Sequence, residues 1–334
     1  MNAADLVDGA LELLVVPSFS RIGPEVRSRL DHWGSAAPVD LTGRVVVITG
    51  ATSGIGGAAA RSLAGRGATT VIIGRDELRT RRAVEAIRSE TGNPAVESVL
   101  ADLGDLDQVR HAADAIAARF GRVDVLVHNA GALLHERAET AEGIEVTVAS
   151  QVAGPFLLTS LLLDQLAEAG PGRVITVSSG GMYAAELTVD GLQMAPDRYD
   201  GTKQYALAKR AQVTLNELWA ERVPAAEVVF HAMHPGWADT PGVDAALPTF
   251  KRVMGPLLRT PASGADTAVW LAGDDGEPLA SSGGFWLDRR LRPIHRLPST
   301  RRSDTPARRR ELWGWVTAQV DAPPLPPHDA EPSS

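Results

Sequence analysis

The sequence predicts an α/β fold with a doubly wound parallel sheet and helices on both of its faces, and three observations lead to this prediction. Short apolar runs typical of buried strands alternate with longer helical segments from Leu41 to about Ala272. The first of these runs, Arg44 to Ile48, passes directly into a glycine-rich turn. A chain of 334 residues, 44% of them hydrophobic, can also bury one large core around such a sheet.

Composition excludes several classes of function. The formal net charge is −8 and the sequence pI is about 5.5, which disfavours nucleic acid as a partner. The chain has no cysteine, so disulfides, thiol catalysis and cysteine metal sites are excluded. The apolar patch from Ala10 to Val16 is short and follows acidic rather than basic residues, unlike a signal peptide. We therefore expect a cytoplasmic protein with no membrane span.

The first 38 residues precede the alternating region and predict a helical N-terminal extension. Leu6, Leu11 and the run from Leu13 to Val15 indicate one helix, and Pro24 to Trp33 indicates a second. We expect the extension to pack on the domain that follows. Contact with a membrane surface is the alternative, but no basic face accompanies the apolar one.

The turn after the first strand predicts a dinucleotide site. Its three glycines are Gly50, Gly54 and Gly56. Glycines let the backbone turn tightly and approach a pyrophosphate without a Cβ in the way. The helix from Gly57 to Gly65 would turn its positive end toward that anion. A second strand, Thr69 to Ile73, completes the βαβ unit; a purely structural turn is the alternative.

The tip of the second strand carries Gly74, Arg75 and Asp76. At this position an acidic residue suits the ribose hydroxyls of NAD, whereas an arginine suits the 2′-phosphate of NADP. We therefore predict NADP as the preferred cofactor, with NAD possible. Alternatively, Arg75 is a solvated residue beside a helix cap, like its neighbours Arg79, Arg81 and Arg82.

The next three strands also end in polar or small residues. The third leads to Asp102, which can cap a helix that begins near Asp105. The fourth, Val123 to Val127, runs into His128, which has no second ligand at a metal-binding spacing. The fifth ends in Ser178 and Ser179, and strand alternation lets only one of them point into a cleft. The surrounding residues do not match the Gly-x-Ser-x-Gly motif of hydrolases.

Two pairs have the spacing Tyr-x-x-x-Lys, and the local sequence favours the second. Between Tyr199 and Lys203 lies Asp-Gly, a turn signal, whereas helix formers surround Tyr205 and Lys209. Only a helix places both members of such a pair on one face. A free tyrosine has a pKa near 10, so we expect the Lys209 ammonium and the positive nicotinamide to favour the phenolate. Tyr205 is then the acid and base.

In this order the motifs resemble those of the short-chain dehydrogenase/reductase superfamily over roughly residues 39 to 300. Within this superfamily, the motifs are most similar to those of the subgroup that contains the retinol-dehydrogenase-like enzymes and dehydrogenase/reductase family member twelve. The resemblance implies a Rossmann-like fold and hydride transfer between NADP(H) and a carbonyl or alcohol substrate. By resemblance, Ser179 binds the substrate oxygen, Tyr205 transfers the proton and Lys209 holds the nicotinamide ribose. His234 is a rival acid, disfavoured because Tyr205 already fills that role.

The resemblance also assigns the remaining cofactor contacts. The glycine-rich turn contributes Gly50, Thr52, Ser53, Gly54, Ile55 and Gly56, and Arg75 takes the 2′-phosphate. Asp102 and Leu103 lie beside the adenine. Asn129 ties neighbouring strands together, and Ala130 and Gly131 let the backbone lie against the cofactor. The segment with Pro235, Gly236, Trp237 and Thr240 is the clamp on the nicotinamide carboxamide.

One position departs from the superfamily pattern. Where the superfamily places an asparagine that bends a helix and holds a water next to the lysine, this chain has Gln151. Glutamine offers the same amide one methylene further out. A proton relay through Gln151 is then rewired or weakened, so a cofactor-binding sensor or interaction protein of low activity is the second hypothesis. The intact Ser179, Tyr205 and Lys209 favour the enzyme.

The remaining segments set the domain limits. We expect the catalytic domain over residues 39–317 and a disordered tail over 318–334. Pro293 to Arg310 is basic and predicts a loop, and Thr305 can cap a following helix. Pro248 to Thr260 predicts either an apolar lid over the substrate or an ordinary buried helix. The expected partner is a small, apolar carbonyl or alcohol compound, and a homo-oligomer is possible.

Overall fold

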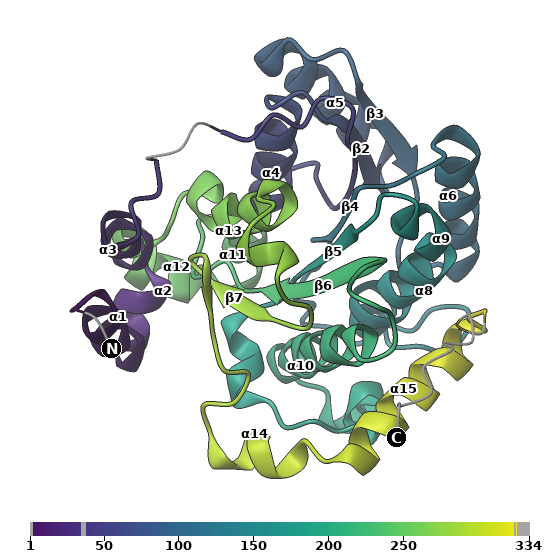
Figure 1. Ribbon diagram of the computed structural model, residues 1–334. Helices are drawn as coiled ribbons and strands as arrows, with labels where there is room; N and C mark the ends of the chain where they lie inside the picture. Colours follow the sequence, from purple (N-terminus) through teal and green to yellow (C-terminus); the bar gives the residue numbers. More distant parts are fainter. Residues whose placement is uncertain (1–2, 35–37, 324, 326–334) are drawn as a thin grey trace, which may run out of the picture.

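The computed structural model describes residues 3–34, 38–323 and 325, and its centre is a single sheet (Figure 1). The sheet has eight strands in the order β3-β2-β1-β4-β5-β6-β7-β8, and all neighbours are parallel except β7 and β8. The strands are β1 (Val45–Thr49), β2 (Thr69–Gly74), β3 (Val96–Leu100), β4 (Val125–His128), β5 (Gly172–Val177), β6 (Val228–Met233), β7 (Phe285–Leu287) and β8 (Arg290–Leu291). The chain order reverses between β1 and β4, the point at which open α/β sheets bind ligands.

Helices cover both faces of the sheet (Figure 1). On one face lie α4 (Gly54–Ala64), α5 (Glu77–Thr91) and α13 (Pro261–Gly273); on the other lie α6 (Leu106–Arg119), α8 (Gly154–Leu161) and α10 (Gly201–Ala220). Each layer buries its own apolar cluster. Because side chains alternate along a strand, Val46 and Ile48 of β1 join one cluster and Val47 joins the other. The predicted doubly wound fold is confirmed.

Further helices complete this part of the chain. They are α7 (Val146–Val148), α9 (Leu163–Ala167), α11 (Pro241–Ala246), α12 (Pro248–Met254), α14 (Pro298–Ser303) and α15 (Pro306–Val320), with a π-helical turn at Ala149–Ala153. The sequence reading missed α14, which lies inside the expected loop. It also placed the end of the domain at residue 317, whereas α15 continues to Val320 because that side chain is buried in the core. Residues 324 and 326–334 of the expected tail lie outside the described residues.

The N-terminal extension forms three helices, α1 (Ala3–Leu13), α2 (Val15–Phe19) and α3 (Ile22–Leu30). The helix expected over Leu6 to Val15 is therefore interrupted at Leu14. Arg27 of α3 is fully buried and pairs with Asp8, Glu12 and Asp288, so ion pairs tie the extension to the domain. Among the described residues, no helix has both the length and the apolar character that crossing a membrane requires.

Candidate active site

A cleft of about 730 Å³ opens at the carboxyl ends of the parallel strands. This volume is in the range of pockets that hold cofactors and small ligands. The cleft is lined by every residue that the sequence assigned to the cofactor, and by Ser179. Of the predicted site residues only Gln151 lies outside this lining. Residues scattered from Gly50 to Thr240 in the chain thus meet at one edge of the sheet.

The glycine-rich turn is closely packed against the end of β4. A Cβ on Gly50, whose φ is +66°, would lie 2.7 Å from Ala130 Cα, and a Cβ on Gly56 would lie 2.2 Å from Asn129 Nδ2. Asn129 Nδ2 donates to the backbone oxygens of Thr49 and Gly50 at 3.1 Å each. Only glycine fits at these two positions, and α4 begins within the turn, with Gly54, Ile55 and Gly56 of its first turn lining the cleft. This cradle fits the pyrophosphate of a dinucleotide.

Arg75 lies where the cleft reaches the end of β2. Its side chain is 74% exposed, and Nη1 lies 3.8 Å from Asp102 Oδ2, a weak and solvated pair. Asp76 is the N-cap of α5, and its Oδ1 accepts the Arg79 N–H at 2.8 Å. One oxygen of the Asp76 carboxylate, which could otherwise bind ribose hydroxyls, is therefore used to cap α5. Arg79 also lines the cleft, so two guanidinium groups border this end.

Ser179, Tyr205 and Lys209 lie together in the middle of the cleft. Tyr205 and Lys209 are both on α10, one turn apart, and Lys209 Nζ is 5.4 Å from the centre of the Tyr205 ring. Lys209 Nζ donates to the backbone oxygen of Val177 at 3.0 Å. Ser178 Oγ donates instead to the backbone oxygen of Lys209 at 3.0 Å. Ser179 is thus the serine whose hydroxyl faces the tyrosine.

Burial dominates the protonation of both α10 groups. It raises the pKa of Tyr205 to about 12, although a hydrogen bond with Ser179 opposes the rise. It lowers the pKa of Lys209 to about 7. The expectation that Lys209 favours the phenolate is therefore not met by the protein alone, because losing water disfavours both charged forms. At neutral pH Tyr205 carries its proton, which suits a proton donor.

The other tyrosine pair, Tyr199 and Lys203, is outside the cleft lining. Tyr199 precedes α10, which begins at Gly201, and its Oη donates to the backbone oxygen of Leu134 at 3.3 Å. Asp200 caps the helix through the amides of Thr202 and Lys203. The Asp-Gly sequence therefore starts α10 rather than interrupting it, and Tyr199 is directed away from Ser179.

Gln151 lies behind the cleft, in the π-helical turn. Its Nε2 donates to the backbone oxygen of Ala132 at 2.8 Å, while Oε1 is buried without a hydrogen-bond partner in the described part of the chain. A Cβ on Gly131 would lie 2.9 Å from that Oε1 and 3.3 Å from Lys209 Nζ. The amide oxygen and Lys209 Nζ thus both lie next to Gly131, at the back of the cleft.

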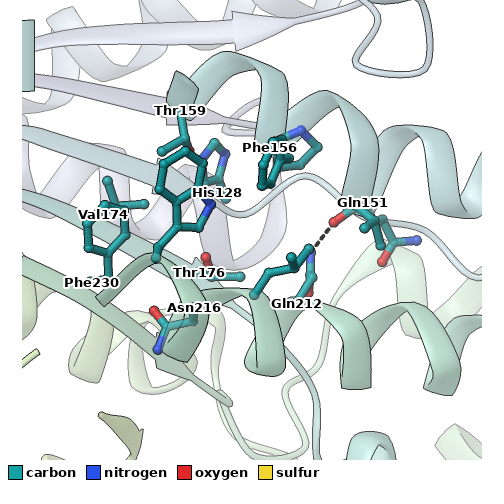
Figure 2. Close-up of a pocket in the computed structure, with 13 residues that line it drawn as sticks. His128, Gln151, Phe156, Thr159, Val174, Thr176, Gln212, Asn216 and Phe230 are labelled. Carbon is teal, nitrogen blue, oxygen red and sulfur yellow. Dashed lines mark hydrogen bonds between the residues drawn. The ribbon is translucent and has the colours of Figure 1, made fainter. Parts of the chain in front are cut away.

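A second, smaller cavity of about 30 Å³ adjoins Gln151 on its other side. Figure 2 shows the Gln212 amide pointing at the backbone oxygen of Gln151, to which its Nε2 donates at 2.6 Å. Gln212 follows Lys209 by one turn of α10. Because Gln212 satisfies this carbonyl, it stabilises the π-helical turn that places Gln151. The sequence reading missed Gln212, since nothing in its spacing distinguishes it from other helix residues.

The histidines near the cleft are neutral packing groups. His128 Nε2 lies 2.7 Å from Thr159 Oγ1, and burial lowers the pKa of His128 to about 3. His234 packs its ring against Phe19 at 4.4 Å between centroids. Burial, and then nearby arginine charges, holds the pKa of His234 well below its usual value. A neutral His234 outside the cleft lining is no candidate for the acid.

The lid, defined here as residues 241–257 with α11 and α12, borders the substrate end of the cleft. None of the residues of α12 is buried, so the alternative of an ordinary buried helix is wrong. Leu247 and Phe250 line the cleft, and Phe250 packs edge-to-face on Trp237 at 5.2 Å. Phe250 lies within the segment Pro248 to Thr260 considered above, but nothing in its spacing indicates that it would face a pocket.

Comparison with known proteins shows what the chain is similar to. The family model described as short chain dehydrogenase matches residues 44–249. Dehydrogenase/reductase SDR family member 12 of Homo sapiens is 39% identical over 274 residues, 82% of this chain and 85% of the relative. DnrU of Streptomyces sp. (strain C5), named provisionally as a daunorubicin C-13 ketoreductase, is 38% identical and covers 76% and 86%. Retinol dehydrogenase 12 of Homo sapiens is 34% identical and covers 80% and 84%.

Solved structures give the same picture. A protein of Escherichia coli CFT073 in complex with NADPH superposes with a TM-score of 0.62 and 25% identity, covering 76% of this chain and 100% of that one. A Shigella flexneri 2a protein in complex with NADP gives a TM-score of 0.61 at 25% identity, with the same coverage. The resemblance inferred from the motifs is confirmed.

Proposed function

The chain belongs to the short chain dehydrogenase family, and we propose that it prefers NADPH and interconverts an apolar carbonyl compound and the corresponding alcohol. The observation that supports this most is the meeting of Ser179, Tyr205 and Lys209 in one cleft with the glycine cradle. Binding alone does not require a hydroxyl and a phenol side by side. Proton-coupled reduction requires both.

The roles of the three residues follow from their protonation and position. Bound NADPH supplies the hydride to the carbonyl carbon, and NADP accepts it in the reverse reaction. Tyr205 Oη gives its proton to the carbonyl oxygen during reduction and takes it back during oxidation. Ser179 Oγ donates a hydrogen bond to the same oxygen and so orients it. Lys209, whose pKa is about 7, exchanges a proton on Nζ near neutral pH.

Preference for NADPH rests on the end of the cleft near β2. Arg75 and Arg79 both line it, while Asp76 is engaged in capping α5. A phosphate there gains charge-assisted hydrogen bonds, whereas a ribose hydroxyl meets a carboxylate, that of Asp76, whose Oδ1 is already engaged by the cap of α5. The two neighbouring structures in complex with NADP and NADPH support this choice.

An apolar substrate is supported by the lining of the other end. Trp237, Leu247 and Phe250 face the cleft, and the lid carries no charged residue into it. The names of two relatives, a daunorubicin ketoreductase and a retinol dehydrogenase, refer to large and mainly apolar molecules. Apolar pockets select by size and shape more than by hydrogen bonds.

The test is a screen of aliphatic, aromatic, steroid and retinoid carbonyls and alcohols, with NADPH and NADH followed by absorbance. We expect turnover of at least one apolar pair with NADPH. Tyr205→Phe should abolish it with cofactor affinity nearly unchanged, because only the transferable proton is removed. The control Tyr199→Phe should keep most activity. Retained activity in the Tyr205→Phe variant would overturn the assignment.

A catalytically weak NADP(H) sensor is the second candidate, favoured by Gln151 at the position of the usual asparagine. The buried, unpartnered Oε1 beside Lys209 argues that the amide still serves the relay. We therefore expect Gln151→Asn to leave turnover similar or raise it, with little effect on cofactor affinity. The sensor is the better explanation if the unmodified protein and the Gln151→Asn variant both bind NADP(H) but neither of them turns over any compound of the screen.

A further inference from the structure

We propose that Phe19, in the N-terminal extension, is a positioning residue that holds the lid over the substrate end of the cleft by acting through Trp237. The inference rests on the proposed function in one respect, that the lid encloses an apolar substrate. Phe19 is 4% exposed although it ends a short helix outside the sheet. It packs in a small apolar cluster with Met182, Tyr183 and side chains of β6 and β7, and its ring also meets Trp237, which lines the cleft.

Aromatic contacts connect the extension to the lid. The ring of Phe19 meets Trp237 edge-to-face at 5.7 Å between centroids and an interplanar angle of 82°. Trp237 in turn meets Phe250 of α12 at 5.2 Å and 83°. Edge-to-face geometry is directional as well as apolar, so the orientation of Phe19 limits that of Trp237. Trp237 and Phe250 both line the cleft, whereas Phe19 does not.

Backbone hydrogen bonds fix the same segments. The Trp237 N–H donates to the backbone oxygen of Phe19 at 2.8 Å, and Arg259 Nε donates to the same oxygen at 2.9 Å. At the far end of the lid, the Arg21 N–H donates to the backbone oxygen of Leu257 at 2.9 Å. The segment just before the lid, at Trp237, and the end of the lid, at Leu257, are therefore joined to the extension at Phe19 and Arg21.

Arg259 makes this junction rigid. It is buried, pairs with Asp288 through Nη1 and Oδ1 at 2.5 Å, and donates from its backbone to Trp237 at 2.8 Å. A Cβ on Gly236, whose φ is +68°, would lie 2.2 Å from Arg259 Nε and 2.5 Å from the backbone oxygen of Phe19. The expected carboxamide clamp thus packs directly on the extension, with no space for an intervening side chain.

Phe19 also borders the other wall of the cleft. A Cβ on Gly180 would lie 2.6 Å from Phe19 Cε2, and Gly180 directly follows Ser179. The ring therefore lies between the backbone after the serine and the segment that carries Trp237. Removing the Phe19 ring would leave a space next to both walls of the cleft. The lid should become the more mobile of the two, because no residue of α11 or α12 is buried.

The experiment compares Phe19→Ala, the conservative variant Phe19→Leu and a control, Leu13→Ala, whose side chain in the same extension is 84% exposed. For a steroid ketone, Phe19→Ala should raise KM about two- to tenfold with kcat less affected, as expected for one lost aromatic contact. For cyclohexanone, which is too small to reach the lid, KM should stay constant, as should the affinity for NADPH. Phe19→Leu, which keeps the apolar bulk but not the edge-to-face contact, should recover only part of the loss, and Leu13→Ala should match the unmodified protein.

Hydrogen–deuterium exchange provides a readout that needs no turnover. In Phe19→Ala, exchange should rise in residues 241–257 and stay constant in β4. An equal change in KM for both ketones, or faster exchange throughout the sheet, would show that Phe19 only supports folding and would overturn the proposal. If the unmodified protein reduces no ketone, the proposed function fails. The role of Phe19 is then still tested by hydrogen–deuterium exchange of residues 241–257 in Phe19→Leu and Phe19→Ala.

Discussion

At the scale of single residues, Arg75 carries the proposed choice of cofactor. Arg75→Ala removes a charge-assisted contact with the 2′-phosphate, worth about 1.5–3 kcal/mol, so NADPH affinity should fall roughly ten- to hundredfold. NADH affinity should stay the same. Fluorescence titration of both cofactors measures this. Arg81→Ala is the control, because Arg81 is exposed on α5 and does not line the cleft. Equal binding of NADH and NADPH to the unmodified protein would contradict the prediction.

Lys209 makes stability depend on pH. Its pKa is about 7 in the folded protein, against 10.5 for an ordinary solvated lysine, so between these values the unfolded chain binds more protons and stability rises with pH. This contribution is about 1.4 kcal/mol per pH unit. Lys209→Met, which keeps the length without the charge, should therefore be more stable than the unmodified protein at pH 6. The advantage should disappear by pH 10.5.

Urea unfolding across this pH range measures the difference between the two proteins. A constant difference would mean that Lys209 is charged at neutral pH despite its burial. Lys203→Met, which removes an exposed lysine from the same helix, is the control and should show no such trend.

Residue-level prediction from sequence succeeds where a residue's role follows from its local context. The choice between Tyr199 and Tyr205 needed only the Asp-Gly turn signal, and α10 does begin there. Gln212 and Phe19 lacked such context, because their contacts join segments far apart in the chain. The protonation of Tyr205 also escaped prediction, since burial and not the nearby charge sets its pKa.

At the scale of elements, the cap of α10 fixes the start of the helix that carries the proposed catalytic pair, Tyr205 and Lys209. Asp200 Oδ1 accepts the amides of Thr202 and Lys203 at 2.9 and 3.0 Å. Asp200→Ala should cost about 1 kcal/mol of stability and lower kcat severalfold, because Tyr205 lies in the next turn. Thr305→Ala removes the equivalent cap of α15 and should cost similar stability without lowering kcat. Thermal melts and steady-state kinetics on both variants make the comparison. A similar loss of kcat in both would mean that global stability is responsible.

Elements with a strong pattern were predictable, and short ones were not. The first five strands are recognisable as apolar runs followed by glycine or polar residues, and each lies within a few residues of its expected place. The strands β7 and β8 have three and two residues, too few to show alternation. They are strands because β7 pairs with β6 and β8 pairs with β7. No local sequence pattern predicts such pairing.

At the scale of the whole molecule, the ion pairs of the extension predict a response to acid. Burial alone would raise the pKa of Asp8, but hydrogen bonds from Arg292 and Arg27 lower it to about 2 from the usual 3.8. The pKa of Asp8 is lower in the folded protein than in the unfolded chain. The ionised Asp8 carboxylate therefore stabilises the folded protein above pH 4, and this stabilisation is lost as the pH falls toward 2. The loss amounts to about 2 kcal/mol.

We therefore expect the extension to lose protection from hydrogen exchange at pH 3 before the sheet does. The isosteric Asp8→Asn should be less stable than the unmodified protein at pH 7 and should lack this acid-dependent step. Simultaneous exchange of the extension and β4 would show that the two unfold as one unit.

The last strand of the sheet has a consequence for assembly. β8 is only two residues long, and its Arg290 pairs with Asp5, Asp8 and Asp31 of the extension. A strand from a second copy that joined the sheet here would have to displace these carboxylates, and charged cover of this kind is how natural sheets avoid joining edge to edge. If copies of the chain associate, they should therefore meet through helices or the opposite edge at β3, leaving the extension at the outside of the assembly.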